Sequence, residues 1–131
     1  MKNTVKRFES LILTVRKLRG ADGCPWDRRQ TTNSLKKYLV EEFEEILEAI
    51  DNNDSANLCE ELGDFFYLIV MVSEINHGEK AFSLQDVLEG INEKLIRRHP
   101  HVFAGSSIAD ETALRKQWDR IKAQEKAEKN G

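Results

Sequence analysis

Acidic side chains recur at a fixed spacing on two neighbouring segments whose apolar pattern predicts helices. Glu42 and Glu45 are three residues apart on the first segment, and Glu61 and Asp64 are three residues apart on the second. Residues at that spacing share one face of a helix. At about 100° per residue, Glu42 falls inside the apolar face centred on Ile46, and Glu61 likewise lies within an apolar face. These positions are unusual for acids that serve only to keep a surface soluble.

The polar turn at residues 51–55 places the two acid pairs in register. In an antiparallel hairpin centred on Asn53, Glu45 and Glu61 lie equally far from the turn, and so do Glu42 and Asp64. Packed helices are about 8–10 Å apart. We therefore expect four carboxylates to converge on one patch.

A cluster of four carboxylates needs a counterion, because an unpaired buried carboxylate costs several kcal/mol. Ligation by oxygen alone suits Mg²⁺, Mn²⁺ or Ca²⁺, and Mg²⁺ commonly keeps waters and binds substrate phosphates. The alternative is that the acids are peripheral, paired with Lys or Arg, or partly protonated. The mirrored register favours a metal site.

Cations and aromatic residues supply candidate binding groups. Lys94 and Arg98 continue the apolar stripe around Ile91, where they either extend to solvent beside the helix end or hold phosphates that a metal does not neutralise. Trp118 lies in a narrow apolar stripe and either anchors its helix or stacks on a base. The sequence also leaves open whether Trp26 lines a pocket or fills space in the core.

Other kinds of site are disfavoured. The sequence contains no phosphate-binding G-x-x-x-x-G-K-[ST] loop and no convincing Ser-His-Asp or Cys-His arrangement. Glu74 and His77 form one E-x-x-H motif, whereas a di-iron bundle needs two. Metal-activated water is the mechanism that remains.

Composition indicates one helical domain over residues 1–131, with a core from about residue 5 to 126. The net charge is −3, which disfavours nucleic-acid polymers as partners. The polar N-terminus, the two cysteines without a CxxC motif and the short apolar run at 65–72 predict a cytoplasmic protein without a membrane segment. Helices are expected at about 4–19, 33–50, 56–75, 83–99 and 110–126, with loops at 20–27 and 100–109.

Three motifs in order resemble the MazG family of all-α nucleoside triphosphate pyrophosphohydrolases. Cys24-Pro-Trp-Asp27 with Gln30-Thr31 is similar to the early loop of that family. Glu41-Glu-Phe-Glu-Glu45 followed by Glu61-Leu-Gly-Asp64 resembles its metal motif, and the stretch from Ile91 to Phe103 resembles a long signature after it. The resemblance extends from about Phe8 to Lys126.

The resemblance implies an antiparallel helical bundle completed by dimerisation, Mg²⁺ as the usual metal with Mn²⁺ as a substitute, and hydrolysis of a nucleoside triphosphate to a monophosphate and pyrophosphate. It implies a homodimer or a higher homo-oligomer. The alternatives are a narrower relative that acts on dUTP-like or phosphoribosyl nucleotides, and a helical metal-binding or interaction module without turnover.

The resemblance makes the following assignments by residue. The metal ligands are Glu42, Glu45, Glu61 and Asp64, with Glu41 in an outer-shell or water-orienting role; the phosphate contacts are Lys94, Arg98 and Lys122, with Trp118 near the nucleotide.

Overall fold

Helices account for all the regular structure in the computed structural model, which describes residues 1–130. The predicted all-α class is confirmed. None of the helices in this range is both long and apolar enough to cross a lipid bilayer. The chain divides into one unit of residues 1–84 and a second of residues 85–131. The proposal of a single domain over residues 1–131 stays a prediction, and its last residue lies outside the described range.

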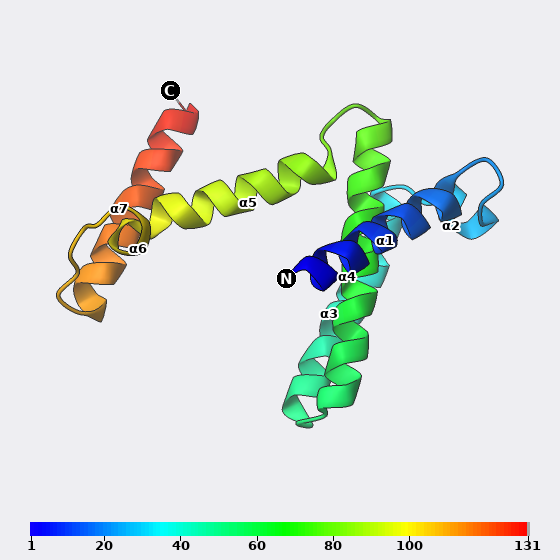
Figure 1. The fold of residues 1–131 in the computed structure, drawn as a ribbon, viewed down its shortest axis with the longest axis horizontal. Helices are drawn as coiled ribbons and strands as arrows, with labels where there is room; N and C mark the ends of the chain where they lie inside the picture. The colour runs from blue at the N-terminus through cyan, green and yellow to red at the C-terminus, as the bar shows by residue number, and fades with distance from the viewer. Residues whose placement is uncertain (131) are drawn as a thin grey trace. The chain divides into compact units, whose positions relative to one another are not determined.

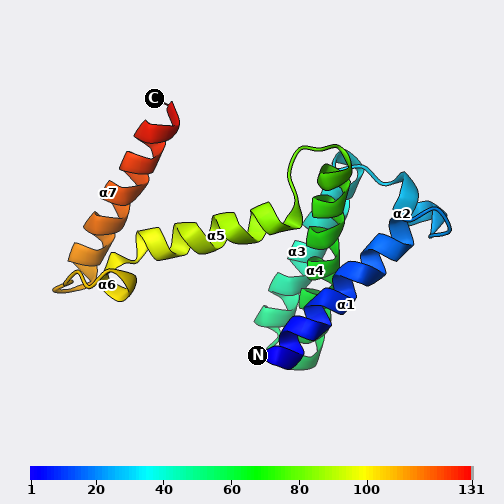
Figure 2. The same ribbon diagram turned by 45° about the horizontal axis from the view of Figure 1, so that its top comes forward.

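A helical hairpin is the centre of the first unit. Helices α3 (Lys36–Asp51) and α4 (Ser55–Gly78) run side by side and antiparallel, as Figures 1 and 2 show. The turn between them is tight because Asn53 adopts a left-handed conformation with φ of 54°. The carboxylate of Asp54 then accepts a hydrogen bond from the backbone N–H of Asn57 at 3.0 Å and caps α4. The turn lies where the sequence places it.

The core of this unit forms where α1 (Lys2–Arg19) packs against the hairpin. Four side chains in it are fully buried, Val15 on α1, Leu35 before α3, and Val70 and Met71 on α4. Burying a side chain of this size contributes about 1.5–3 kcal/mol. The apolar run at 65–72 in α4 therefore supplies much of the core, although Phe66 within it is half-exposed.

Two short helices lie where the sequence analysis expected loops. Helix α2 (Pro25–Arg29) interrupts the loop at 20–27, and α6 (Pro100–Phe103) interrupts the loop at 100–109. Each begins at a proline, because the fixed φ of proline suits the first helical position and its missing N–H is not needed there. The preceding helices end at Arg19 and Arg98, close to the predicted ends at 19 and 99, and each proline then starts a short helix.

The start of the second predicted helix also differs in detail. Thr31 and Ser34 exchange hydrogen bonds, each side-chain oxygen accepting from the other residue's backbone N–H at 3.0 and 2.8 Å. A 3₁₀ turn at Asn33–Leu35 follows before α3 begins at Lys36. The reciprocal cap therefore begins two residues before the predicted start of this helix at residue 33.

The second unit contains α5, α6 and α7. Helix α5 (Leu84–Arg98) has its first residue in the core of the first unit. Helix α7 (Glu111–Asn130) begins after Asp110, whose carboxylate accepts a hydrogen bond from the N–H of Ala113 at 2.9 Å. Arg97 and Arg98 at the end of α5 both form ion pairs with Glu125 of α7 and join the two helices.

Candidate functional site

Three carboxylates from the two helices of the hairpin meet at one place. Glu42 and Glu45 of α3 and Glu61 of α4 each offer a carboxylate oxygen, and these oxygens all lie within 4.8 Å of one another. Glu61 is buried and Glu45 is exposed, so the cluster extends from the helix interface to solvent. Their approach follows from the three-residue spacing on each helix and the symmetric turn.

The cluster has no cationic partner within the part of the chain that the structure describes. The ion pairs there involve Glu74 and Glu125 instead. Oε2 of Glu42 and Oε2 of Glu61 are buried and accept no hydrogen bond from residues 1–130. A buried acceptor without a donor costs about 1–3 kcal/mol, and more when it is charged.

The proximity of the acids changes how strongly they hold protons. Burial raises the pKa of Glu42, and the nearby Glu45 and Asp64 carboxylates raise it further. The pKa of Glu45 is raised first because its carboxyl group can share a proton with Glu61, and then by repulsion from that side chain. A proton shared with Glu42 is likewise the main reason why the pKa of Glu61 is raised. Without a metal, the cluster is therefore a set of carboxylates that resist simultaneous ionisation.

The residues fit a divalent cation. Two oxygens bound to one Mg²⁺ at about 2.1 Å are at most about 4.2 Å apart, so small side-chain movements bring the three oxygens to that spacing. A cation would also satisfy the two buried oxygens that lack a donor. The donor set consists only of carboxylate oxygens, which favours Mg²⁺ or Mn²⁺ over softer metals.

A cavity of about 240 Å³ opens beside the cluster. Asp64 lines it together with Glu41, Glu42 and Glu45, so the fourth predicted ligand and the predicted outer-shell residue lie at the same site. The remaining lining residues are Trp26, Tyr38, Tyr67 and Leu68. The lining of the cavity therefore combines acidic and aromatic side chains.

Trp26 serves both of the roles that the sequence left open. It packs against the core, and it lines the cavity, where its ring meets Tyr38 edge to face with centroids 5.3 Å apart. This geometry is favourable for an aromatic pair. The tryptophan thus connects the early loop to the acidic site.

The early loop is held in place by polar contacts that the sequence analysis missed. Asp27 is buried, and one of its carboxylate oxygens accepts a hydrogen bond from the hydroxyl of Tyr67 on α4. Burial and the Asp27 carboxylate raise the pKa of Tyr67, so its hydroxyl remains a donor at neutral pH. Arg19 donates to the backbone oxygen of Asp27 at 2.5 Å. The spacing of three residues between Asp64 and Tyr67 places Tyr67 on the face of α4 that carries Asp64, but it does not indicate Asp27 as the partner.

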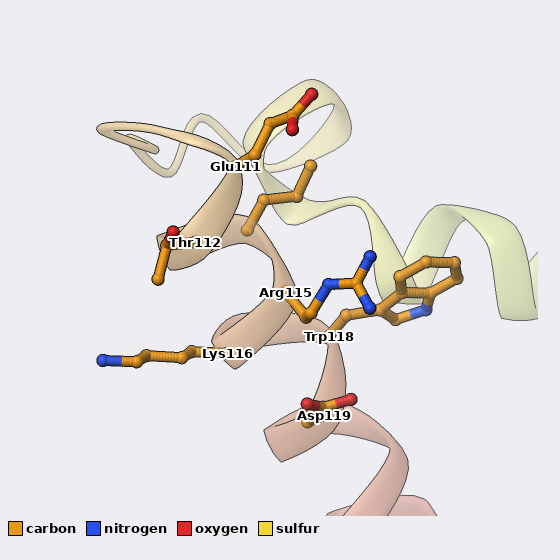
Figure 3. Close-up of a pocket in the computed structure, with 7 residues that line it drawn as sticks. Glu111, Thr112, Arg115, Lys116, Trp118 and Asp119 are labelled. Carbon is orange, nitrogen blue, oxygen red and sulfur yellow. The ribbon is translucent and has the colours of Figure 1, made fainter.

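The predicted cations lie in the second unit. Lys94, Arg98 and Lys122 line one pocket of about 630 Å³ between α5 and α7. Trp118 lies on α7, where Nζ of Lys122 is 5.2 Å from its ring centroid. Figure 3 shows Trp118 at a neighbouring pocket, with Arg115 beside it on the same helix. The structure therefore gathers the three cations together, as it gathers the acids in the first unit.

A sequence model of the MazG nucleotide pyrophosphohydrolase domain matches residues 30–103. That range covers more than half of the chain. The chain belongs to the MazG family. The match includes the whole acidic cluster, Lys94 and Arg98, whereas Trp118 and Lys122 fall outside it.

Individual relatives extend the match over nearly the whole chain. The chain is 47% identical over 129 residues to the nucleoside triphosphate pyrophosphohydrolase/pyrophosphatase MazG of Thermotoga maritima, covering 98% of this chain and 49% of that protein. It is 36% identical over 126 residues to the nucleoside triphosphate pyrophosphohydrolase of Escherichia coli K12, covering 95% of this chain and 48% of that protein. The chain thus spans about half the length of these two enzymes.

A solved structure has the same fold. The crystal structure of a mazG-related protein from Thermotoga maritima superposes with a TM-score of 0.72 at 33% identity, covering 90% of this chain and 98% of that chain. The identity is high enough to support common family membership as well as a shared fold.

The raised pKa values predict how stability depends on pH in the absence of metal. A carboxyl group with a raised folded-state pKa binds its proton more tightly when folded, so its contribution to stability falls as pH rises from about 4.5 through the raised pKa. Glu42→Gln removes one interacting charge. In chelator, we expect this substitution to raise the melting temperature by a few degrees at pH 7.5 and by less at pH 5.

Thermal unfolding followed by circular dichroism measures this difference. Glu44→Gln is the control, because Glu44 is exposed and outside the cluster, and its effect should be equal at the two pH values. A lower melting temperature for Glu42→Gln than for the unmodified chain at pH 7.5 would contradict the repulsion.

Proposed function

We propose that this chain is a Mg²⁺-dependent nucleoside triphosphate pyrophosphohydrolase. The observation that carries the proposal is the convergence of Glu42, Glu45 and Glu61, with two buried oxygens that lack donors, in a chain of the MazG family. Relatives named as nucleoside triphosphate pyrophosphohydrolases support the choice of substrate.

In the proposed reaction, a water oxygen forms a bond to the α-phosphorus of the triphosphate. The bond from that phosphorus to the oxygen bridging to the β-phosphate breaks, and the products are a nucleoside monophosphate and pyrophosphate. A divalent cation held by the acidic cluster supplies an acidified water and neutralises phosphate charge. No side chain needs to act as a covalent nucleophile.

The residues of the chain have distinct tasks in this proposal. Glu42, Glu45, Glu61 and Asp64 hold the cation, and Glu41 at the cavity edge orients water as an outer-shell group. Lys94, Arg98 and Lys122 hold the phosphates through charge-assisted hydrogen bonds. Trp118, which is 41% exposed, has a ring available near the nucleotide.

The proposal includes a homodimer or a higher homo-oligomer. Apolar stripes remain exposed on each long helix of the hairpin, with Val40, Phe43 and Leu47 on α3 and with Leu62 and Phe66 on α4. Contiguous apolar surface of this kind marks an interface. A second copy is the occupant we propose, because it would bring equivalent stripes and complete a bundle around the hairpin.

Activity tests the metal site directly. Hydrolysis should stop when a chelator removes divalent cations and return when Mg²⁺ is added. Glu42→Gln and Asp64→Asn should each lower kcat/KM by more than about a hundredfold, because each removes a proposed ligand. Pyrophosphate release from the eight common ribonucleoside and deoxyribonucleoside triphosphates measures both the activity and the base preference.

Glu44→Gln is the matched control, since it changes the same residue type on the same helix outside the cluster. It should retain activity within about twofold. Full activity in Glu42→Gln, or equal loss in both variants, would refute the assignment. Turnover of a single nucleotide such as dUTP would instead support the narrower substrate range.

The oligomer is tested by light scattering at micromolar concentration. The unmodified chain should have at least twice the mass of one chain. Leu47→Asp should shift the mass towards one chain because it places a charge in the exposed stripe of α3. Val102→Asp, at an exposed apolar position on α6 outside the stripes, should leave the mass unchanged. A monomeric mass for the unmodified chain would contradict the proposal.

A further inference from the structure

One carboxylate joins two arginines at the meeting of α5 and α7. Oε2 of Glu125 accepts a hydrogen bond from Nε of Arg97 at 2.5 Å. Oε1 of the same residue accepts from Nη2 of Arg98 at 2.8 Å and from Nε of Arg98 at 3.2 Å. We refer to Glu125 and these two arginines as the arginine clasp.

The clasp is a stronger pairing than an ordinary surface ion pair. The difference lies in Arg98, which is 18% exposed beside a Glu125 that is 19% exposed, whereas Arg97 at 50% is about as exposed as Arg16 at 55% in the pair with Glu74. Hydrogen bonds first from Arg98 and then from Arg97 lower the pKa of Glu125 to about 2. The carboxylate is therefore ionised throughout the neutral pH range, and both guanidinium groups have a permanent partner.

The clasp leaves specific donors unused. A guanidinium group has five N–H donors in a rigid planar fork. Glu125 engages Nε and Nη2 along one edge of Arg98 but only Nε of Arg97. Within residues 1–130, no protein acceptor engages Nη1 of Arg98 or either terminal amino group of Arg97. With both groups held by Glu125, the directions of the remaining donors are fixed as well.

These donors belong to a strongly basic pocket. It has a volume of about 630 Å³, and its cations outnumber its acids. The lining residues are Lys94, Arg97, Arg98, Lys122, Glu125, Lys126, Glu128 and Lys129. A chain of several phosphates matches this pocket in charge and in the number of acceptors it offers to fixed N–H groups.

We propose that Glu125 is a positioning residue that holds Arg97 and Arg98 ready to bind a polyphosphate chain. The identification of that chain as the triphosphate of a nucleotide rests on the proposed function. Arg98 is already a proposed phosphate contact; the structure adds Arg97 and assigns Glu125 to their orientation. The benefit is that the arginines lose little conformational freedom when the ligand binds.

Removing Glu125 has two opposing consequences. It adds one net positive charge to the pocket, which attracts anions, and it frees two long side chains, which weakens binding. The charge effect on exposed groups is screened over about 8 Å at 0.15 M salt, and over less at higher salt. The loss of orientation does not depend on salt in this way. Measurements at 0.15 M and 0.5 M salt therefore distinguish the two effects.

Binding of inorganic tripolyphosphate to the full chain in chelator, measured by isothermal titration calorimetry, tests the proposal without turnover. We expect Glu125→Ala to weaken binding about tenfold at 0.5 M salt and by less at 0.15 M, where the added positive charge partly offsets the loss. Glu125→Gln should weaken binding less than Glu125→Ala because its amide oxygen still accepts hydrogen bonds. Glu74→Gln is the matched control, because Glu74 also accepts from an arginine Nε across two helices. Its affinity should be unchanged.

A second arm shows whether Glu125 acts through the arginines. In an Arg97→Ala, Arg98→Ala background at 0.5 M salt, where the charge effect is screened, Glu125→Ala should cause no further loss of tripolyphosphate affinity. Circular dichroism of each variant verifies that the helices remain, and Glu125→Gln serves if the alanine variant unfolds. Unchanged or tighter binding by Glu125→Ala, the same loss in both backgrounds, or no binding by the unmodified chain would each overturn the proposal.

The outcome is separate from that of the proposed function. If the chain binds tripolyphosphate as expected but hydrolyses no nucleotide, the positioning role of Glu125 is supported and the proposed function is contradicted. If the chain is an active enzyme but Glu125→Ala does not change its affinity for tripolyphosphate, the proposed function is supported and the positioning role is contradicted.

Discussion

Repulsion between carboxylates is the constraint on which the first unit depends. The hairpin forces acids of α3 and α4 to within a few ångströms of one another, and two of their oxygens are buried without a donor. Such an arrangement persists because apolar packing around Val70 and Met71 holds the helices together independently of the acids. The site is therefore unfavourable by itself, and the divalent cation that we propose there would offset the repulsion. This is the usual relation between a metal site and the scaffold that positions it.

The loop before the hairpin completes the site through contacts that are unrelated to the metal. Asp27 is fixed by Tyr67 from one side and by Arg19 from the other, and this fixes Trp26 at the cavity. The pocket of the second unit is basic where the cavity of the first is acidic, and here Glu125 fixes two arginines. In each unit an acidic side chain with hydrogen-bond partners, Asp27 or Glu125, therefore fixes residues that line a pocket.

The sequence predicted the parts of this arrangement that depend on spacing. The three-residue intervals and the symmetric turn around Asn53 predicted that four carboxylates converge. The structure brings Glu42, Glu45 and Glu61 close together, whereas Asp64 lines the adjoining cavity. Periodicity also identified the long helices. Phe43 lies close to Ile46 in the predicted apolar face at 33–50, yet its side chain is 53% exposed. A pattern of apolar residues does not by itself distinguish a buried face from an exposed one.

Spacing and periodicity along the chain do not predict contacts between residues that are distant in sequence. Nothing in local spacing connects Asp27 with Tyr67, or Glu125 with Arg97, because those pairs depend on how helices cross. The short helices at Pro25 and Pro100 were missed for another reason, since proline both ends one segment and begins the next.

The central claim is that the hairpin acids hold a divalent cation, and crystals of the full chain soaked in Mn²⁺ test it most directly. The anomalous scattering of manganese locates the ion without reference to activity. The account predicts an anomalous peak bounded by the carboxylates of Glu42, Glu45 and Glu61. Manganese peaks only at other sites, with these carboxylates unliganded, would contradict it.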